Sequence, residues 1–323
     1  MDHLRHSLRT LASFRNAHAG GSIIVCACGE SLNTLAQPER FITIGVNDVG
    51  RKFDPDYLVV VDPPEAFGGD RFHYVKTSRA GAFFTQRTDL GIDHPNIVQF
   101  RLGTKDGTDL SDPDVLNYSV TTPYVALCLA LHMGAANIGL IGIDFTDNHF
   151  FGPTGPHNWA AYVETIDAQF DRLCRAAFAH GTRVFNLSER SRLTAAPKMT
   201  LETFASLATS QKRQDRPLRI VSYATTPLVG VPTMLARCIN ARTPHYARCV
   251  WAFDRYRTGI SFVQDINWNA SPARAEAEIE AADVIVLHNG KVDERHRTLI
   301  DGKPAVTMAH NYMENVNDRY VRR

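Results

Sequence analysis

The sequence predicts an α/β protein: a Rossmann-like domain with a mostly parallel sheet, followed by a second, smaller Rossmann-like domain. Short apolar runs with the length of buried strands alternate with helical patterns along most of the chain. Continuous apolar strands are typical of parallel sheets, which are covered on both faces. Several of these runs end in polar residues, and a charged segment divides the pattern in two. Since ligands bind beyond the carboxyl ends of such strands, we expect a site at one edge of the first sheet.

The composition is that of an ordinary globular protein, because 44% of the 323 residues are hydrophobic and 21% are charged. The formal net charge of +1 gives no electrostatic reason to expect nucleic acid or an anionic membrane as the main partner. No apolar run approaches the ~18 residues that span a bilayer. Residues 1–21 lack the apolar core of a signal peptide and are expected to form a tail or a short helix. We expect a cytoplasmic protein, and a homo-oligomer stays open.

The first strand is expected at residues 22–28, where an apolar run is ended by Gly29. A turn containing Ser31 and Asn33 follows, and then a short helix as far as Gln37. A strand, a glycine-containing turn and a helix together place backbone N–H groups and a helix N-terminus against a phosphate. The turn has one glycine, so it does not match the Gly-x-Gly-x-x-Gly fingerprint of dinucleotide-binding proteins.

Two more buried strands are expected at residues 41–46 and 57–61. The first leads into Asn47 and Asp48, and the second ends at Asp62. Because the carboxyl ends of parallel strands meet at one edge of a sheet, these side chains are candidate ligand contacts beside the first turn.

Residues 118–152 contain the other half of the predicted site. Ser119 and Thr121 stand just before an apolar stretch with the pattern of a buried helix. The strand after that helix ends in Asp144, and Asp147 and His149 follow in a polar loop. This segment therefore brings hydroxyl, carboxylate and imidazole groups to the same sheet edge.

The remaining elements of the first domain follow from the same periodicities. An exposed loop rich in Asp, Gly and Thr, which could serve as a lid, is expected at residues 102–117. The other expected elements are strands at 82–86, 97–101, 138–143 and 182–187 and helices at 125–133 and 159–180.

We place the domain boundary at residues 210–217, a charged linker without apolar residues. The first domain then comprises residues 22–209 and the second residues 218–323. The second repeats the α/β pattern, with strands expected at 219–223, 250–253, 261–263, 282–288 and 305–309 and helices at 234–239 and 273–282. Its strand-end residues His288 and His310 have no predicted role.

Five segments of the first domain carry a resemblance to known families: residues 23–33, 42–49, 54–64, 119–145 and 184–193. Together they resemble the bacterial sialyltransferases that use CMP-sialic acid. They are also similar to the 6-hydroxymethylpterin diphosphokinase-like family, which includes motility accessory factors. The resemblance covers about residues 22–195. The second domain resembles the N-terminal half of a GT-B glycosyltransferase.

The sialyltransferase resemblance implies nucleotide contacts at Gly29, Ser31, Asn47, Ser119 and Thr121. It also implies that Asp144 lies beside the donor. To these contacts we add Asn33 and Asp62, which stand at neighbouring strand ends.

The sequence departs from the sialyltransferase pattern at two places. Where the family has Gly-Asn-Gly-Pro-Ser, this chain has Ala-Cys-Gly-Glu-Ser at residues 27–31. Thr146 and Gly152 occupy the positions of two family tyrosines that assist departure of the phosphate.

Sugar transfer needs a general base with a pKa near the working pH, which suits histidine. His149 and His157 are the histidines in the candidate loops. The resemblance places the base in the loop that contains His157, with a shifted spacing. We therefore name His157 first and His149 second.

Three functions stay open. The first is a metal-independent glycosyltransferase that joins a sugar from a nucleotide-sugar, with CMP-sugars among the candidates, to a glycan acceptor in surface-polysaccharide or glycoconjugate synthesis. The second is a diphosphokinase-like enzyme using ATP and Mg²⁺, for which the carboxylates could act as hard ligands: Asp48, Asp62, Asp144 and Asp147. The third is a non-catalytic scaffold in a glycan-assembly complex. Only the second requires a metal.

Overall fold

The computed structural model describes residues 10–155, 159–209, 218–225, 230–243, 245–252 and 265–310. The chain divides into two compact units. The first unit is Met1–Ala196 with Thr200–Thr209, and the second is Pro197–Met199 with Ser210–Arg323. The predicted linker at residues 210–217 lies outside the described residues, so the domain boundary stays a prediction. The predicted α/β class with two mostly parallel sheets is confirmed.

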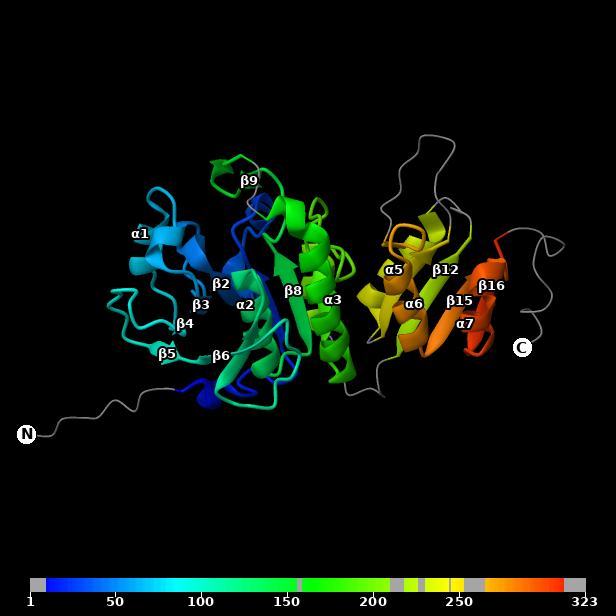
Figure 1. The fold of residues 1–323 in the computed structure, drawn as a ribbon, viewed down its shortest axis with the longest axis horizontal. Helices are drawn as coiled ribbons and strands as arrows, with labels where there is room; N and C mark the ends of the chain where they lie inside the picture. Colours follow the sequence, from blue (N-terminus) through cyan, green and yellow to red (C-terminus); the bar gives the residue numbers. More distant parts are fainter. Residues whose placement is uncertain are drawn as a thin grey trace, which may run out of the picture. The chain divides into compact units, whose positions relative to one another are not determined.

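The first unit contains a seven-stranded sheet in which all neighbouring strands are parallel (Figure 1). The order across the sheet is β11-β8-β1-β2-β3-β4-β5. Its strands are β1 Ser22–Cys26, β2 Ile42–Val46, β3 Tyr57–Val59, β4 Ala82–Thr85, β5 Ile97–Gln99, β8 Asn137–Ile141 and β11 Arg183–Asn186. Nearly every residue of the central strands is buried, as their apolar runs predict.

The direction in which the chain builds this sheet reverses between β1 and β8. From β1 the strands β2 to β5 are added on one side, and the chain then returns to add β8 and β11 on the other. Cys26, the last residue of β1, is paired with Ile141, the last residue of β8. Helices that leave such neighbours cover opposite faces of the sheet, so a crevice opens beyond the strand ends.

Helix α2 (Thr122–His132) packs against β1, β2 and β3 and is buried almost all round. It begins three residues earlier than expected, because Pro123 has a fixed φ that suits the first helical turn. It ends before Gly134, whose φ of +79° closes the helix. Helix α3 (Val163–Ala179) is amphipathic and buries Ile166, Phe170 and Leu173.

Shorter helices complete the first unit. The turn after β1 is the 3-10 helix η2 (Glu30–Thr34), shorter than the expected helix that ran as far as Gln37. The others are η1 Leu11–Phe14, η3 Pro38–Arg40, η4 Asn47–Arg51, η5 Pro64–Ala66, η6 Ala160–Tyr162, α1 Arg71–Lys76 and α4 Leu201–Thr209.

Residues 102–117 differ from the expected exposed loop. Strands β6 (Arg101–Lys105) and β7 (Val115–Tyr118) pair in parallel as a separate two-stranded sheet. The Asn117 side chain is buried and holds the connection, accepting from Thr104 N (2.9 Å) and donating to the Asp109 carbonyl (2.6 Å). The interpretation of the two ends of this segment as loop was wrong, because β6 is polar and largely exposed and β7 is only four residues long.

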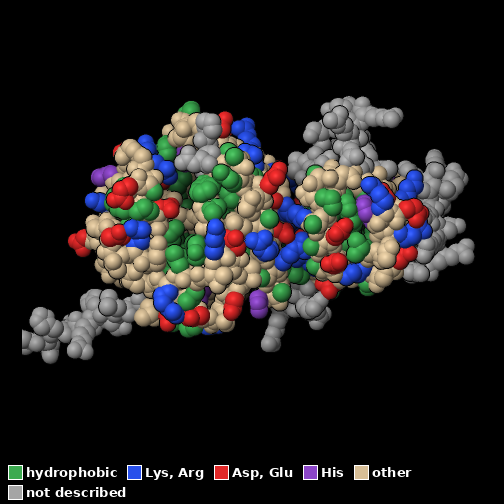
Figure 2. Space-filling view, in the orientation of Figure 1, with side chains coloured by type: hydrophobic (Ala, Val, Ile, Leu, Met, Phe, Trp, Pro, Cys, Tyr) green, Lys and Arg blue, Asp and Glu red, His purple; other side chains and the backbone are tan. Residues whose placement is uncertain are grey.

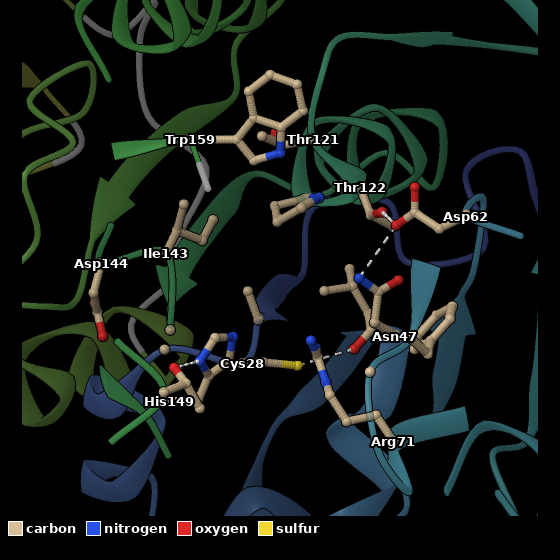
Figure 3. A pocket seen from close by; sticks show the side chains of 18 of the residues that line it. Cys28, Asn47, Asp62, Arg71, Thr121, Thr122, Ile143, Asp144, His149 and Trp159 are labelled. Carbon is tan, nitrogen blue, oxygen red and sulfur yellow. Dashed lines mark hydrogen bonds between the residues drawn. The ribbon is translucent and has the colours of Figure 1, made fainter. Parts of the chain in front are cut away.

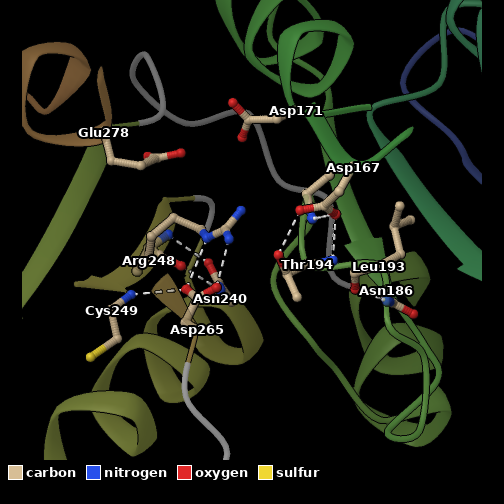
Figure 4. Close-up of polar contacts among 12 residues, drawn as sticks. Asp167, Asp171, Asn186, Leu193, Thr194, Asn240, Arg248, Cys249, Asp265 and Glu278 are labelled. Atoms are coloured by element: carbon tan, nitrogen blue, oxygen red, sulfur yellow. Dashed lines mark hydrogen bonds and ion pairs between the residues drawn. The ribbon is translucent and has the colours of Figure 1, made fainter. Parts of the chain in front are cut away.

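The second unit contains a five-stranded parallel sheet in the order β14-β13-β12-β15-β16. A buried ion pair joins Arg219 to Glu278 in this unit. The buried Arg248 pairs with the partly buried Asp265 (Figure 4). The strand expected at 261–263 lies outside the described residues. The elements are β12 Arg219–Ala224, β13 Tyr246–Trp251, β14 Ile266–Asn267, β15 Val284–His288, β16 Ala305–Met308, α5 Val231–Arg242, α6 Pro272–Ala281, η8 Glu294–His296 and α7 Arg297–Asp301.

Within the described parts of the chain, we find no helix with the length and apolar character needed to cross a membrane.

Candidate functional site

A cavity of about 890 Å³ opens at the carboxyl edge of the first sheet (Figure 3). It is lined by residues that follow β1, β2, β3 and β8, by the N-terminus of α2 and by Trp159. These are the strand ends around the point where the sheet order reverses. The cavity therefore occupies the place where open α/β sheets bind their ligands.

Ser31 and Asp144 connect the two central strand ends, and Asp144 lines the cavity. The Ser31 N–H donates to Asp144 Oδ2 (2.7 Å), and the Ser31 hydroxyl donates to Asp144 Oδ1 (2.7 Å). The same hydroxyl accepts from Gly142 N (2.8 Å). Asp144 is 3% exposed, and Ser31 does not line the cavity. The pair therefore connects the turn after β1 to the end of β8.

Gly29 lacks a side chain because there is no room for one. A Cβ at this position would lie 2.5 Å from Asp144 Oδ2 and 2.6 Å from the Gly142 carbonyl oxygen. The Gly29 N–H donates to that same carbonyl (2.7 Å). The single glycine of the turn thus allows β1 and β8 to approach closely where their ends meet, and the Gly29 backbone lines the cavity.

Asn47 and Asp62, which follow β2 and β3, line the opposite wall. Asn47 has a φ of +53°, a left-handed conformation that asparagine tolerates better than most residues. Its Nδ2 lies 3.5 Å from Asp62 Oδ2, which also accepts from the Thr122 hydroxyl (3.0 Å). This contact joins the wall to the first turn of α2.

The N-terminus of α2 faces the cavity through Thr121, Thr122 and Pro123. Thr121 makes no side-chain capping bond, and no acidic residue lies in the first turn of the helix. Ser119 accepts from Thr121 N (3.4 Å) and does not line the cavity. A helix N-terminus carries a partial positive charge and unsatisfied N–H groups, so this end of α2 suits an anion.

Three buried polar atoms of the lining have no hydrogen-bond partner among the described residues: Asn47 Oδ1, Thr121 Oγ1 and Thr146 Oγ1. Buried polar groups in folded proteins are nearly always paired, so each such group calls for an explanation. Their occurrence around one cavity points to a polar ligand as the missing partner.

Arg51 and Arg71 also line the cavity and were missed in the sequence. Arg71 makes two hydrogen bonds to Asp48, which is fully buried. Burial alone would lower the pKa of Arg71, but the hydrogen bond and charge of Asp48 outweigh it and raise that pKa. Arg51 pairs with Asp70 (3.3 Å) and stacks on Phe151, 4.4 Å from the ring centroid. Among isolated basic residues in loops, nothing in the sequence distinguishes these two.

His149 belongs to a small hairpin over the end of β1, formed by β9 (Asn148–His149) and β10 (Gly152–Pro153). It forms an isolated bridge with Gly29, and Phe150 N donates to the Cys28 carbonyl (3.0 Å). His149 Nδ1 lies 2.6 Å from the Thr154 hydroxyl, and both residues line the cavity. The structure therefore brings His149 to the other candidate residues.

One further predicted residue, Asn33, is described and is not among those lining the cavity. Asn33 is exposed, donating to the Phe150 carbonyl (2.9 Å) and accepting from Lys52 Nζ (2.7 Å). It therefore supports the hairpin instead of contacting the cavity. His157 lies outside the described residues. Of the residues that sequence reasoning missed, Trp159 and Phe151 add aromatic surface to the lining.

No group of three or more His, Cys, Asp or Glu residues in the described part of the chain could hold a metal ion. Of the four carboxylates considered as ligands, Asp48 is bound by Arg71 and Asp144 by Ser31. Asp62 lines the cavity, and its Oδ2 accepts from Asn47 and Thr122. Asp147 is exposed and does not line the cavity.

Two histidines, His288 and His310, lie together in the second unit, at the ends of β15 and β16. His288 is 2% exposed, with Nε2 2.7 Å from the Ser222 hydroxyl and Nδ1 2.6 Å from His310 Nε2. Burial, and to a lesser degree the charge of His310, lowers the pKa of His288 to about 4. The cluster therefore favours the neutral imidazole.

No protein-family model matches the sequence, and no curated protein matches it. One solved structure that is similar to this chain is the MAf glycosyltransferase from Magnetospirillum magneticum AMB-1, with 13% sequence identity and a TM-score of 0.37. The similarity covers 70% of this chain and 40% of that protein. This chain thus spans well under half of that protein's length. The identity and the TM-score are too low for this likeness to bear on the chemistry of the site.

Proposed function

We propose that this protein is a glycosyltransferase that uses a nucleotide-sugar donor. The observation that carries the proposal is the set of unpartnered oxygens around a cavity at the sheet's reversal point, beside the N-terminus of α2. Such a site suits a ligand with an anionic phosphate and many hydroxyl groups. The choice of sugar transfer rests on the sequence resemblance of residues 22–195 to sialyltransferases.

In the proposed reaction the acceptor hydroxyl attacks the anomeric carbon of the donor sugar. A C–O bond forms to the acceptor, and the bond from that carbon to the phosphate oxygen breaks, so the nucleotide leaves with the bonding electrons. His149 takes the proton of the acceptor hydroxyl in this proposal, since it is a candidate base among the described residues and lines the cavity. The N-terminus of α2 and Arg51 stabilise the charge that develops on the departing phosphate.

This arrangement favours transfer without a metal over the diphosphokinase reaction. That reaction needs free hard-oxygen ligands for Mg²⁺. Asp48 and Asp144 have their carboxylate oxygens engaged by Arg71 and Ser31, and Asp62 Oδ2 accepts from Asn47 and Thr122. We keep CMP-sugars among the candidate donors, surface polysaccharide or glycoconjugate synthesis as the pathway, and the cytoplasm as the location.

A thermal-shift series with CMP, UDP, GDP, ADP and ATP, each with and without Mg²⁺, tests the proposal. A nucleotide at 100 times its Kd should stabilise the protein by about 2.7 kcal/mol. A shift from CMP or UDP without metal is the expected result. A shift from ATP that requires Mg²⁺ would favour the kinase, and no shift from any nucleotide would favour the scaffold.

A pair of threonine variants shows whether such a shift comes from this cavity. Thr121→Val deletes a hydroxyl that has no partner among the described residues, so it should weaken nucleotide binding without lowering stability. Thr122→Val deletes the hydrogen bond to Asp62 and should cost about 1 kcal/mol of stability. Nucleotide affinity equal to the parent's in Thr121→Val would remove Thr121 Oγ1 from the site.

A further inference from the structure

Two exposed aromatic side chains continue the cavity outward. Trp159 lines the cavity and is 38% exposed, and Tyr162, three residues later, is 57% exposed. Both stand at the start of the α3 segment, Trp159 just before η6 and Tyr162 at its end. Hydrophobic side chains are visible on the face of the first unit that Figure 2 shows. Large aromatic rings exposed at the mouth of a cavity are a common sign of a binding surface.

The rings of Trp159 and Tyr162 form a corner. Their centroids are 5.8 Å apart and their planes are inclined by 65°. A flat nucleobase is best held between parallel faces, which this corner does not provide. A pyranose ring instead has one face of C–H groups and a rim of hydroxyls. It can lay that face on one aromatic ring and meet the second ring at its edge.

We propose that Trp159 and Tyr162 form the subsite for a pyranose ring of the acceptor glycan. This inference rests on the proposed function, because it assigns the inner cavity to the nucleotide-sugar. The acceptor is the larger substrate and has to extend into solvent, whereas a donor is largely enclosed. Trp159 lines the cavity, whereas Tyr162 does not line it and is the more exposed of the two, so the pair leads from the cavity to the protein surface.

The tryptophans of the chain allow a direct measurement. The sequence has three, and Trp251 and Trp268 are buried, with 1% and 5% exposed. A collisional quencher such as acrylamide should therefore act mainly on Trp159. The parent protein, with saturating nucleotide present, is first applied to an array of immobilised neutral oligosaccharides. A saccharide that binds is then added in solution during acrylamide quenching.

The expected result is that the saccharide protects the parent's tryptophan emission from acrylamide. Trp159→Ala and Tyr162→Ala should each weaken saccharide binding about tenfold, which corresponds to ~1.4 kcal/mol. Trp159→Phe keeps a ring and should retain part of the affinity. Met234→Ala is the matched control, because Met234 is 56% exposed and lies on α5 in the second unit. It should leave binding unchanged.

Two results would overturn the inference. One is a parent protein that binds no saccharide on the array, and the other is undiminished binding by both alanine variants. The nucleotide shift separates this failure from that of the proposed function. If nucleotides still stabilise the parent and the variants, the donor site stands and only the acceptor subsite is wrong. If nucleotides stabilise none of them, the proposed function fails first.

Discussion

Ser31→Ala is the substitution that most sharply separates a nucleotide contact from a structural one. The sequence resemblance implies that Ser31 touches the nucleotide, whereas in the structure its hydroxyl is committed to Asp144 Oδ1 and Gly142 N. Removing it leaves a buried carboxylate oxygen and a backbone N–H without partners. We therefore expect Ser31→Ala to lower stability more than it lowers nucleotide affinity.

The size of this loss follows from the two hydrogen bonds. A bond to a charged group contributes about 1.5–3 kcal/mol, and an unsatisfied buried N–H costs about 1–3 kcal/mol. Ser31 itself is only half-buried, so water can replace part of the loss. We therefore expect Ser31→Ala to lower the free energy of unfolding by about 3 kcal/mol, near the lower end of the sum of the two contributions. For a unit of this size that corresponds to a fall in Tm of roughly 6–12 °C.

Urea unfolding, followed by tryptophan fluorescence and circular dichroism, measures the difference in unfolding free energy between Ser31→Ala and the parent. Thr34→Ala is the control, because its hydroxyl donates to the Ser31 carbonyl (2.8 Å) at an exposed position of the same 3-10 helix. It should cost less than about 1 kcal/mol. If Ser31→Ala is as stable as this control but no longer binds nucleotide, Ser31 is a direct contact and the structural reasoning is refuted.

Further predictions concern three other residues. Asn47→Gly and Asn47→Ala should weaken nucleotide binding equally, but the alanine should lose an extra ~1 kcal/mol of stability at φ +53°; equal stabilities would contradict that strain. His149→Ala should lower kcat by ~10²–10⁴ with nucleotide affinity unchanged, and a fully active variant would exclude it as the base. The folded-state pKa of His288, about 4, lies below its ordinary value of 6.5. Neutral His288 therefore contributes fully to the stability of the folded protein above pH 6.5, and this contribution is lost as the pH falls toward 4. Between pH 7.5 and pH 4.5, the free energy of unfolding measured with urea should fall less for His288→Asn than for the parent. Equal decreases would refute this linkage.

The strands of the first sheet could be predicted because they are buried on both faces and therefore apolar throughout. The polar residues that follow these strands, Asn47, Asp62 and Asp144, could therefore be placed at the carboxyl edge of the sheet from the sequence. β6 and the hairpin that contains His149 were missed, since short polar strands have the composition of loops. Local sequence predicts an element well when burial alone determines its residues.

The detailed roles of the site residues could not be predicted. Asp144 and Ser31 are far apart in the sequence, and only the parallel pairing of β1 with β8 brings them together. Arg51 and Arg71 reach the cavity because α1 and η4 contact each other, which no local pattern indicates. A residue's position after a strand therefore predicts its presence at the sheet edge, but not whether it faces the ligand or the neighbouring strand.

The bond between Ser31 and Asp144 also has a consequence for how the protein folds. The two residues are 113 positions apart, and the Gly142–Ser31 bond spans 111. Contacts between residues so far apart in the sequence are expected to form slowly, because the intervening chain must lose conformational entropy before these contacts can stabilise the fold. During synthesis the turn after β1 cannot form these hydrogen bonds until β8 and the residues after it have been made. Chains released before that point would expose the apolar edge of β1, so aggregation should compete with folding most strongly at this stage.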